Sequence, residues 1–384
     1  MRVLHVSSGN MYGGVETLLA TLAREAQAAP EMEPHFALCF EGRLSAELRA
    51  LGRSPHLLGR ARISRPCTMV LARRELGALL RREAYDVVVC HQPWTCVMFA
   101  SVIRAAGLPV VLWAHMASEG RHWLERLCRL TCPDLVVCNS RFTAGLVSRW
   151  LPRAHVEHVY APLSLPQPSR NDTGRRVIRK ALETPELDVV LVQVSRLEAF
   201  KGHRVLLSAL GQLRGLAGWT CWIVGGIQRP EEAGYLRELQ DLAHRQGIAE
   251  RVRFVGERPD VIQVLSAADV YCQPNTSPEG FGLTFVEAMH AGLPVVTSGI
   301  GGACEIVDGS CGVLTPPGDV PALTEALNRL IVDREFSTRL GVEARRRSES
   351  LCHVPRQMGR IQSLLAAVST GSDLDFCAPA KIKI

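Results

Sequence analysis

The segment Ser277–Met289, with the sequence SPEGFGLTFVEAM, is the strongest constraint in this chain. It places two carboxylates, Glu279 and Glu287, eight positions apart, with Gly280 and Gly282 between them. Glycines let a backbone approach a ligand closely, and a helix N-terminus offers free N–H groups and a partial positive charge. The pattern therefore indicates an anion site flanked by two acids, which matches a ligand such as a nucleotide-sugar, with a diphosphate between sugar and nucleoside.

The two acids are expected to play different parts. If a helix begins near Leu283, Glu287 lies one turn further, roughly 6 Å along the axis. A diphosphate at the helix start would then leave Glu287 beside the ribose hydroxyls, and Glu279 would face the sugar. The alternative, a capping acid and an exposed helix acid, is less favoured because both acids occur together with Gly280 and Gly282.

Composition limits the class of protein. The 384 residues are 47% hydrophobic and 21% charged, which is typical of a globular chain of two domains. The net charge of +6 suits anionic ligands or an acidic membrane surface, whereas 5% aromatic residues argue against a nucleic-acid partner. The scattered cysteines and the absence of an apolar run of about 18 residues predict a cytoplasmic protein, at most peripheral at the inner face of a membrane.

Short apolar runs alternate with longer amphipathic segments, which predicts an α/β fold with two doubly wound, Rossmann-like parallel sheets. In such a fold, ligands bind in a cleft between the domains. The expected strands are Arg2–Ser7, His35–Cys39, Val87–His91, Val110–Ala114, Leu135–Asn139, Val156–Tyr160, Asp188–Ser195, Thr220–Gly225, Val252–Gly256, Val270–Gln273, Pro294–Thr297 and Gly312–Leu314.

Domain boundaries follow from a Pro-, Ser- and Asn-rich stretch near the middle of the chain. We expect an N-terminal domain at 1–165, a linker at 166–186 and a C-terminal domain at 187–354. The polar, aperiodic residues 370–384 are expected to be a disordered tail.

Polar residues follow several of these strands. Gly13 and Gly14 form a glycine pair after the first strand, where a phosphate or sugar could approach, although a plain turn would explain them too. Arg196 and Lys201 follow the first strand of the second domain and could stabilise a diphosphate, unless they are solvated surface charges. His115 ends another strand and could donate a hydrogen bond to a sugar hydroxyl, although a lone histidine is more often structural.

Two other features are weaker. Asp373 and Asp375 resemble a metal-binding D-x-D pair but follow neither a strand nor a glycine loop, so no metal and no cofactor are expected. An Arg-rich stretch from Arg60 to Arg82 contains Val70 and Leu71, so it could lie on anionic lipid or form an ordinary solvated face.

These segments resemble the retaining glycosyltransferases of family 4, which have the GT-B fold. The Glu279–Glu287 spacing matches that family's E-x7-E motif, and Gly13–Glu16, Asn139–Phe142 and Arg196–Gly202 look like further family segments. The resemblance covers roughly residues 1–365.

The resemblance implies a role for each matching residue. Arg196 and Lys201 would hold the diphosphate, Glu287 the ribose, and His115 the sugar. Glu279 would bind the donor sugar and phosphate, and the base would lie near Gly256. Further donor contacts would come from Gly13, Gly14, Gly280, Phe281, Gly282 and Leu283. In this fold the last helix, expected at 355–369, crosses back to the first domain.

The family also implies a reaction: transfer of a sugar from a UDP- or GDP-sugar to a hydroxyl acceptor in a glycan or glycolipid, with retention and without a metal. Two alternatives remain open from the residues. One is another GT-B enzyme, such as a sugar epimerase or phosphorylase, and the other is a non-catalytic glycan-assembly subunit.

Overall fold

The computed structural model describes residues 1–9, 11–165, 172–230 and 232–371, and it divides the chain into two compact units. Unit 1 comprises Met1–Asn139, Ala144–Pro162 and the chain from Val354 onward. Unit 2 comprises Ser140–Thr143 and Leu163–His353. The expected tail at 370–384 lies almost entirely outside the described residues.

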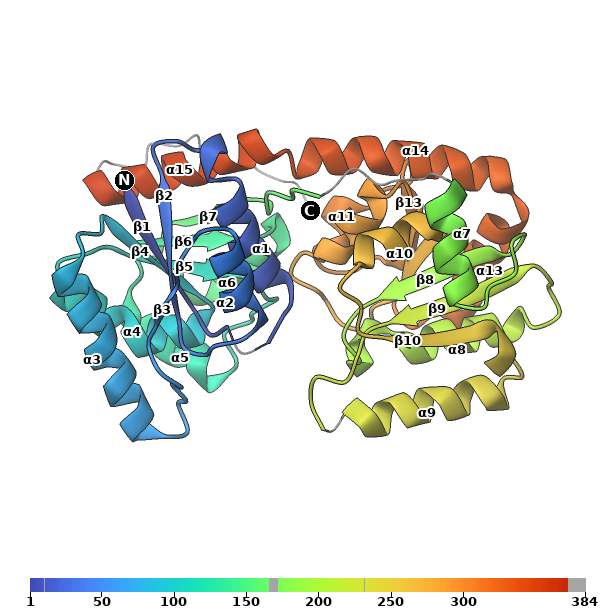
Figure 1. Cartoon of the computed structure of the whole chain (residues 1–384), viewed down its shortest axis with the longest axis horizontal. Helices are drawn as coiled ribbons and strands as arrows, with labels where there is room; N and C mark the ends of the chain where they lie inside the picture. Colours follow the sequence, from blue (N-terminus) through green and yellow to red (C-terminus); the bar gives the residue numbers. More distant parts are fainter. Residues whose placement is uncertain (10, 166–171, 231, 372–384) are drawn as a thin grey trace. The chain divides into compact units, whose positions relative to one another are not determined.

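Unit 1 is built on a seven-stranded parallel sheet in the order β3-β2-β1-β4-β5-β6-β7 (Figure 1). Its strands are largely apolar runs and are buried at every residue in 87–91, 110–114 and 135–138, as expected for a sheet covered on both faces. They are β1 (Arg2–Ser7), β2 (Glu33–Leu38), β3 (His56–Leu57), β4 (Val87–His91), β5 (Val110–Ala114), β6 (Leu135–Cys138) and β7 (Val156–His158).

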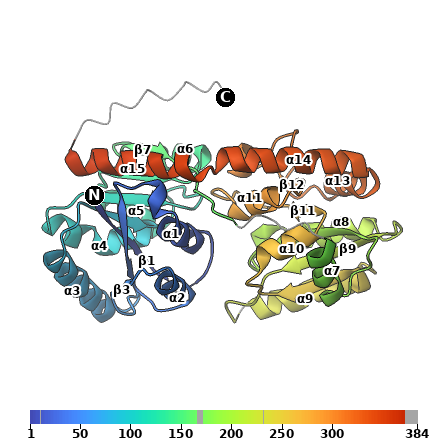
Figure 2. The same cartoon turned by 45° about the horizontal axis from the view of Figure 1, so that its top comes forward.

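The helices associated with unit 1 alternate with these strands. The C-terminal helix α15 lies along this unit, where it contacts η1 and β4 (Figure 2). The Gln362 side chain also exchanges hydrogen bonds with Glu31. These helices are α1 (Gly14–Arg24), η1 (Ala26–Ala28), α2 (Arg43–Ala50), α3 (Pro66–Arg82), α4 (Pro93–Ala105), α5 (Trp123–Cys128), η2 (Arg129–Thr131), α6 (Arg141–Trp150, mostly in unit 1) and α15 (Val354–Thr370).

Unit 2 repeats the architecture with a six-stranded parallel sheet in the order β10-β9-β8-β11-β12-β13. Its core contains the fully buried Trp219, Trp222 and Tyr271. The strands are β8 (Val189–Val194), β9 (Trp219–Val224), β10 (Val252–Gly256), β11 (Val270–Gln273), β12 (Val295–Ser298) and β13 (Gly312–Thr315). The helices are α7 (Asp172–Ala181), η3 (Ala199–Lys201), α8 (His203–Gln212), α9 (Glu232–Arg245), η4 (Ala249–Arg251), α10 (Val261–Ala267), α11 (Leu283–His290), α12 (Ala303–Ile306), α13 (Val320–Val332) and α14 (Arg334–Leu351).

The predicted fold class is confirmed: both sheets are parallel and doubly wound. The sequence did not indicate α2 or the two-residue strand β3. The range 166–186 is not simply a linker, because it contains helix α7. Arg175 and Arg179 of α7 form ion pairs of 2.6 Å with the two oxygens of Asp269, which joins α7 to the rest of unit 2.

Candidate functional site

An ion pair lies at the carboxyl edge of the unit 2 sheet. Lys201 ends the short helix after β8, and Glu279 lies in the loop between β11 and α11. The Lys201 Nζ–Glu279 Oε1 distance is 2.5 Å, and the two side chains are only 9% and 19% exposed. The two residues are 78 positions apart, so the neighbouring strands β8 and β11 bring them together.

Glu279 is held by amides as well as by the lysine. Its Oε2 accepts hydrogen bonds from Gln273 Nε2 at 3.1 Å and Asn275 Nδ2 at 3.0 Å. Tyr271 donates its hydroxyl to Gln273 Oε1 at 2.9 Å, which turns the NH2 group of Gln273 toward the carboxylate. On the other side, Gln193 Nε2 donates to the Lys201 carbonyl at 2.9 Å. The carboxylate is therefore held by three donors, and the backbone of the lysine is anchored as well.

Two glycines let the loops of this site approach one another. Gly202 has φ +78°, and a Cβ at this position would lie 1.8 Å from the carbonyl oxygen of Pro274. Gly302 donates its N–H to the Glu279 carbonyl at 2.9 Å, and a Cβ there would lie 2.3 Å from the Gly280 oxygen. A side chain at position 202 would push the backbone of Pro274 away, and a side chain at position 302 would displace Gly280, next to Glu279.

Glu287 lies one turn into α11, which begins at Leu283 as the sequence predicted. Among the described residues, no hydrogen bond or ion pair involves its partly buried carboxylate. Burial raises the pKa of Glu287 from 4.5 to about 7. The charged form of such a buried carboxylate would be stabilised by a ligand that supplies hydrogen-bond donors, such as the hydroxyls of a ribose.

The other predicted site residues of unit 2 lie at the same edge of the sheet. Arg196 follows β8, but its guanidinium pairs with Glu198 at 3.1 Å and is about one third exposed. Gly256 ends β10 with φ +78°. Gly280, Phe281 and Gly282 lead from Glu279 into α11, where Phe281 is buried and Gly282 caps the helix.

Unit 1 presents a different set of groups at its carboxyl edge. His115 directly follows β5, and its Nε2 lies 2.9 Å from Nδ1 of His91. Gly13 precedes α1, and Gly14 is the first residue of that helix. A Cβ at Gly13 would have its nearest contact at 3.8 Å, so packing does not require a glycine there.

Several residues that complete these clusters were not predicted. Gln193, Gln273 and Asn275 surround the ion pair, and His91 and His5 lie behind His115. The two glutamines are single polar residues at or near the ends of apolar strands. That position was the available signal, because a polar side chain buried in a strand needs a partner.

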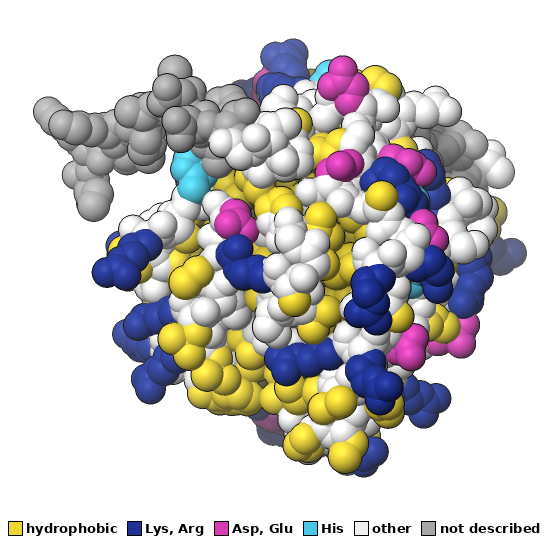
Figure 3. Space-filling model, turned by 90° about the vertical axis from the view of Figure 1, so that its left-hand side faces the viewer, with side chains coloured by type: hydrophobic (Ala, Val, Ile, Leu, Met, Phe, Trp, Pro, Cys, Tyr) yellow, Lys and Arg dark blue, Asp and Glu magenta, His cyan; other side chains and the backbone are white. Residues whose placement is uncertain are grey.

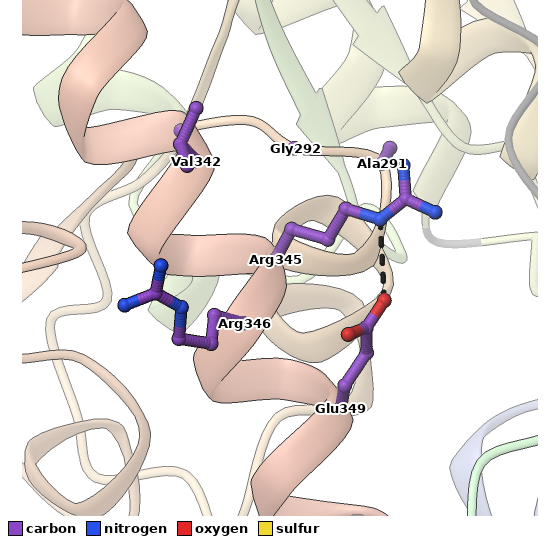
Figure 4. Close-up of a pocket in the computed structure, with 7 residues that line it drawn as sticks. Ala291, Gly292, Val342, Arg345, Arg346 and Glu349 are labelled. Carbon is purple, nitrogen blue, oxygen red and sulfur yellow. Dashed lines mark hydrogen bonds and ion pairs between the residues drawn. The ribbon is translucent and has the colours of Figure 1, made fainter.

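A cavity of about 300 Å³ lies elsewhere in unit 2, between α14 and the turn after α11 (Figure 4). Arg345 and Glu349 of α14 form an ion pair of 3.2 Å beside it. None of the predicted site residues lines this cavity. Its lining residues are Ala291, Gly292, Gly341, Val342, Arg345, Arg346 and Glu349. Within the described ranges, no group of three or more His, Cys, Asp or Glu side chains is arranged to hold a metal ion.

Comparison with known families separates the two halves of the chain in the same way as the fold. A family model described as Glycosyltransferase Family 4 matches residues 12–167. A second, described as Glycosyl transferases group 1, matches residues 174–347. Together they match most of the chain.

The chain belongs to glycosyltransferase family 4.

Individual relatives agree with this assignment. The family 4 chain is 30% identical over 285 residues to D-inositol 3-phosphate glycosyltransferase of Corynebacterium diphtheriae, covering 70% of this chain and 63% of the relative. It is 43% identical over 157 residues to phosphatidyl-myo-inositol mannosyltransferase of Mycobacterium leprae, covering 39% and 40% of the two chains. The chain thus matches less than two thirds of the length of these relatives.

A solved structure shows the same fold over nearly the whole family 4 chain. It is the Anabaena protein HepE, solved in complex with UDP and glucose. The TM-score is 0.86 with 23% sequence identity, and the match covers 96% of this chain and 100% of HepE. This likeness confirms the predicted GT-B fold.

Proposed function

We propose that the chain is a glycosyltransferase that moves a sugar from a UDP- or GDP-sugar to a hydroxyl group of a glycan or lipid-linked acceptor. The observation that carries the proposal is the fixed Lys201–Glu279 pair beside the N-terminus of α11, with Glu287 one turn further. The relatives support it, because their names describe an inositol phosphate glycosyltransferase and a phosphatidylinositol mannosyltransferase.

The donor diphosphate would bind at the start of α11. The first N–H groups of a helix have no partner within it, so they can receive phosphate oxygens. Lys201 has three N–H donors, and the structure records one of them on Glu279. The ammonium group could therefore keep this contact and also bind the diphosphate, together with Arg196.

Glu287 would bind the ribose of the donor. A carboxylate can accept a hydrogen bond from each of two neighbouring hydroxyls. Since burial alone raises its pKa to about 7, two new donors would favour the charged form. Donor binding should therefore release a fraction of a proton near neutral pH.

We propose a chemical step with retention at the anomeric carbon, which is what the family resemblance implies. The bond between that carbon and the diphosphate oxygen breaks, and the acceptor oxygen bonds to the carbon on the same face. The acceptor proton passes to the departing phosphate oxygen. Arg196, Lys201 and the helix N-terminus would stabilise the negative charge that grows on the leaving group.

We assign neutralisation of the leaving group's negative charge to Arg196 and Lys201 rather than to a metal ion. Treatment of the purified chain with EDTA should then leave the transfer rate unchanged. A rate that falls with EDTA and returns with Mg²⁺ or Mn²⁺ would contradict this assignment.

Donor binding can be tested first by thermal shift. A ligand that binds only the native state raises the melting temperature, so the chain should respond to one or more of the UDP-, GDP- and ADP-sugars. The responding donor is then incubated with candidate acceptors, and the products are analysed by mass spectrometry. Failure of all the donors to bind would favour a non-catalytic glycan-assembly subunit.

The same products separate transfer from the other GT-B activities. A free epimerised nucleotide-sugar would indicate an epimerase, and dependence on inorganic phosphate would indicate a phosphorylase. A sugar attached to the acceptor hydroxyl supports the proposal.

We also propose that α3 of unit 1 rests on an anionic membrane surface. Val70 and Leu71 on this helix are 55% and 59% exposed, and Arg74, Arg81 and Arg82 are exposed on the same helix. Figure 3 shows the side of the molecule that carries α3, where apolar side chains lie among Lys and Arg side chains. Apolar and basic groups together are typical of helices that bind at the surface of acidic lipid.

Two further observations bear on this surface. Arg73, which the sequence placed in the basic stretch, points inward and donates to the Met98 carbonyl at 2.6 Å, so it is not part of the surface. None of the described helices is long and apolar enough to span a bilayer.

Vesicle sedimentation tests the membrane proposal. The chain should bind vesicles with acidic lipid at low salt and leave them at high salt. Replacing Arg74 and Arg81 by Gln should weaken binding by about 2 kcal/mol, since each basic residue contributes about 1 kcal/mol at such a surface. Arg339→Gln, an exposed change on α14 of unit 2, is the matched control. Equal binding by all three proteins would disprove a role for α3.

A further inference from the structure

Three histidines of unit 1 form a continuous chain of ring contacts. His5 Nδ1 lies 3.0 Å from His91 Nε2, and His91 Nδ1 lies 2.9 Å from His115 Nε2. His5 and His91 are fully buried, whereas His115 is partly exposed at the outer end. Trp113 stacks on both His91 and His115.

The register of the sheet produces this chain. His5 of β1 pairs with Val89 of β4, and His91 lies two residues further along β4 on the same face. His91 in turn pairs with Trp113 of β5, and His115 lies two residues beyond it. The three rings thus step diagonally across β1, β4 and β5 from the interior to the carboxyl edge of the sheet.

The surroundings keep all three rings neutral. Burial lowers the pKa of His5 to about 3, that of His91 well below its usual value, and that of His115 to about 3. Among the described residues, no carboxylate forms an ion pair with any of them. A buried imidazolium without a counter-ion would be strongly unfavourable.

Neutrality leaves two arrangements of the ring protons. Each neutral imidazole carries one N–H, and each ring-to-ring bond needs one proton. Either every ring is protonated at Nδ1, so that His5 donates to His91 and His91 donates to His115, or every ring is protonated at Nε2 and both bonds run the other way.

The inner end of the chain decides between the two. His5 Nε2 is buried and has no hydrogen-bond partner within the described residues. In the second arrangement this atom would be a buried N–H without an acceptor, a situation that folded proteins rarely contain. In the first arrangement it is a ring nitrogen without a proton, so the chain runs outward and His115 carries its proton on Nδ1.

We propose that His91 is a positioning residue that donates to His115 Nε2 and thereby holds His115 as the Nδ1–H tautomer, with a hydrogen-bond donor at the outer end of the chain. The fixed N–H would meet an oxygen of the sugar or acceptor, and this part rests on the proposed function. A substrate hydroxyl at this position must accept from His115, so its own proton has to point elsewhere. His115 then selects the orientation of the hydroxyl as well as its presence.

The test measures tautomers directly, without substrate. Long-range 1H–15N spectra of the full chain, labelled with 15N-histidine, distinguish Nδ1–H from Nε2–H for each ring. Wild-type His115 should be Nδ1–H. An Nε2–H signal for His115 in the wild-type protein would overturn the proposal, whether or not any variant folds.

Two substitutions at position 91 separate donation from packing. In His91→Gln the amide oxygen can accept from His5 while the NH2 group donates to His115, so His115 should stay Nδ1–H. In His91→Phe the ring stacking remains but the donor is lost, so the Nε2–H form should become populated and kcat/KM should fall about three- to tenfold. His115 that stays fully Nδ1–H in His91→Phe would contradict the role of His91.

His5→Phe is the matched control for the tautomer. It removes the innermost ring but leaves His91 able to donate to His115, so His115 should remain Nδ1–H. If the wild-type tautomers agree with the proposal but no sugar is transferred, the proposed function fails and the hydrogen-bond chain stands.

Discussion

The two sheets carry different polar groups at their carboxyl edges, although they share one topology. In unit 2 the edge holds charges: Lys201 and Glu279 form an ion pair, and Glu287 lies one turn into α11. In unit 1 the edge is reached by a chain of neutral rings that ends at His115, because burial lowers the pKa of His5, His91 and His115.

The difference follows from what each edge supplies to its polar groups. Glu279 has a cation and two amide donors around it, so its charge is matched locally. The histidines have only one another and aromatic rings, which stabilise neutral imidazoles. A charged edge suits a diphosphate, and a neutral edge with a fixed N–H suits the hydroxyls of a sugar or acceptor.

The largest expected effect comes from removing the cation in unit 2. Lys201→Met should lower kcat about 10²–10³-fold, since under the proposed function it removes one fixed group that would stabilise the leaving diphosphate. It should also destabilise the fold by about 2 kcal/mol, because Glu279 loses its cation in a partly buried position. Steady-state kinetics and thermal unfolding of the same protein measure both effects.

Two further variants show whether the loss reflects charge at this edge. Lys180→Met, at an exposed position of α7, should change neither quantity. The double variant Lys201→Met, Glu279→Gln should recover stability but not activity, because the unpaired carboxylate is gone while the cation is still missing. Full activity in Lys201→Met would show that the ion pair is only structural.

The sequence predicted the buried strands and the loop that carries Glu279, and for the strands the reason is physical. A parallel strand buried on both faces must be a continuous apolar run, and Val110–Ala114 was predicted with the bounds that the structure has. Helix α7 could not be found in this way. Its anchoring by Arg179 depends on Asp269, which lies 90 positions away and is brought close only by the fold.

The second expected effect concerns folding stability, whose dependence on pH should differ between the groups at the two edges. Glu287 has a pKa of about 7 when folded and about 4.5 when unfolded, so the unfolded chain loses this proton first. Its contribution to stability therefore falls as pH rises from about 4.5 to 7, by on the order of 3 kcal/mol, and is level above that range. The buried histidines have the opposite slope, since their lowered pKa makes stability rise between about 3 and 6.5.

Glu287→Gln isolates the first of these slopes. The variant should be more stable than wild type at pH 8 and of similar stability at pH 4.5, as measured by thermal unfolding across that range. Glu325→Gln, an exposed change on α13, should follow the wild-type curve. If the difference in stability between wild type and Glu287→Gln stays constant with pH, Glu287 is charged in the free protein at neutral pH.

The histidine chain shows what a sequence pattern leaves undetermined. His5, His91 and His115 stand at or near the ends of three apolar strands, so their sheet edge was predictable. Their contact depends on the strand order β1-β4-β5 and on a two-residue offset at each pairing, which only the fold sets. In the same way, the sequence placed Lys201 and Glu279 in one site but did not indicate that they pair.

The smallest expected effect comes from removing the outermost ring nitrogens of unit 1. His115→Phe keeps an aromatic ring that can stack on Trp113 but has no ring nitrogen, so the bond from His91 is lost and so is the one proposed hydrogen bond to the substrate. Such a bond contributes about 1 kcal/mol, which predicts a fall in kcat/KM of up to about tenfold. His56→Phe, a half-buried histidine outside the chain, is the matched control and should retain wild-type kinetics. A loss as large as that of Lys201→Met would mean that His115 acts on a developing charge and that the neutral edge takes a direct part in the chemistry. No loss at all would remove His115 from the site.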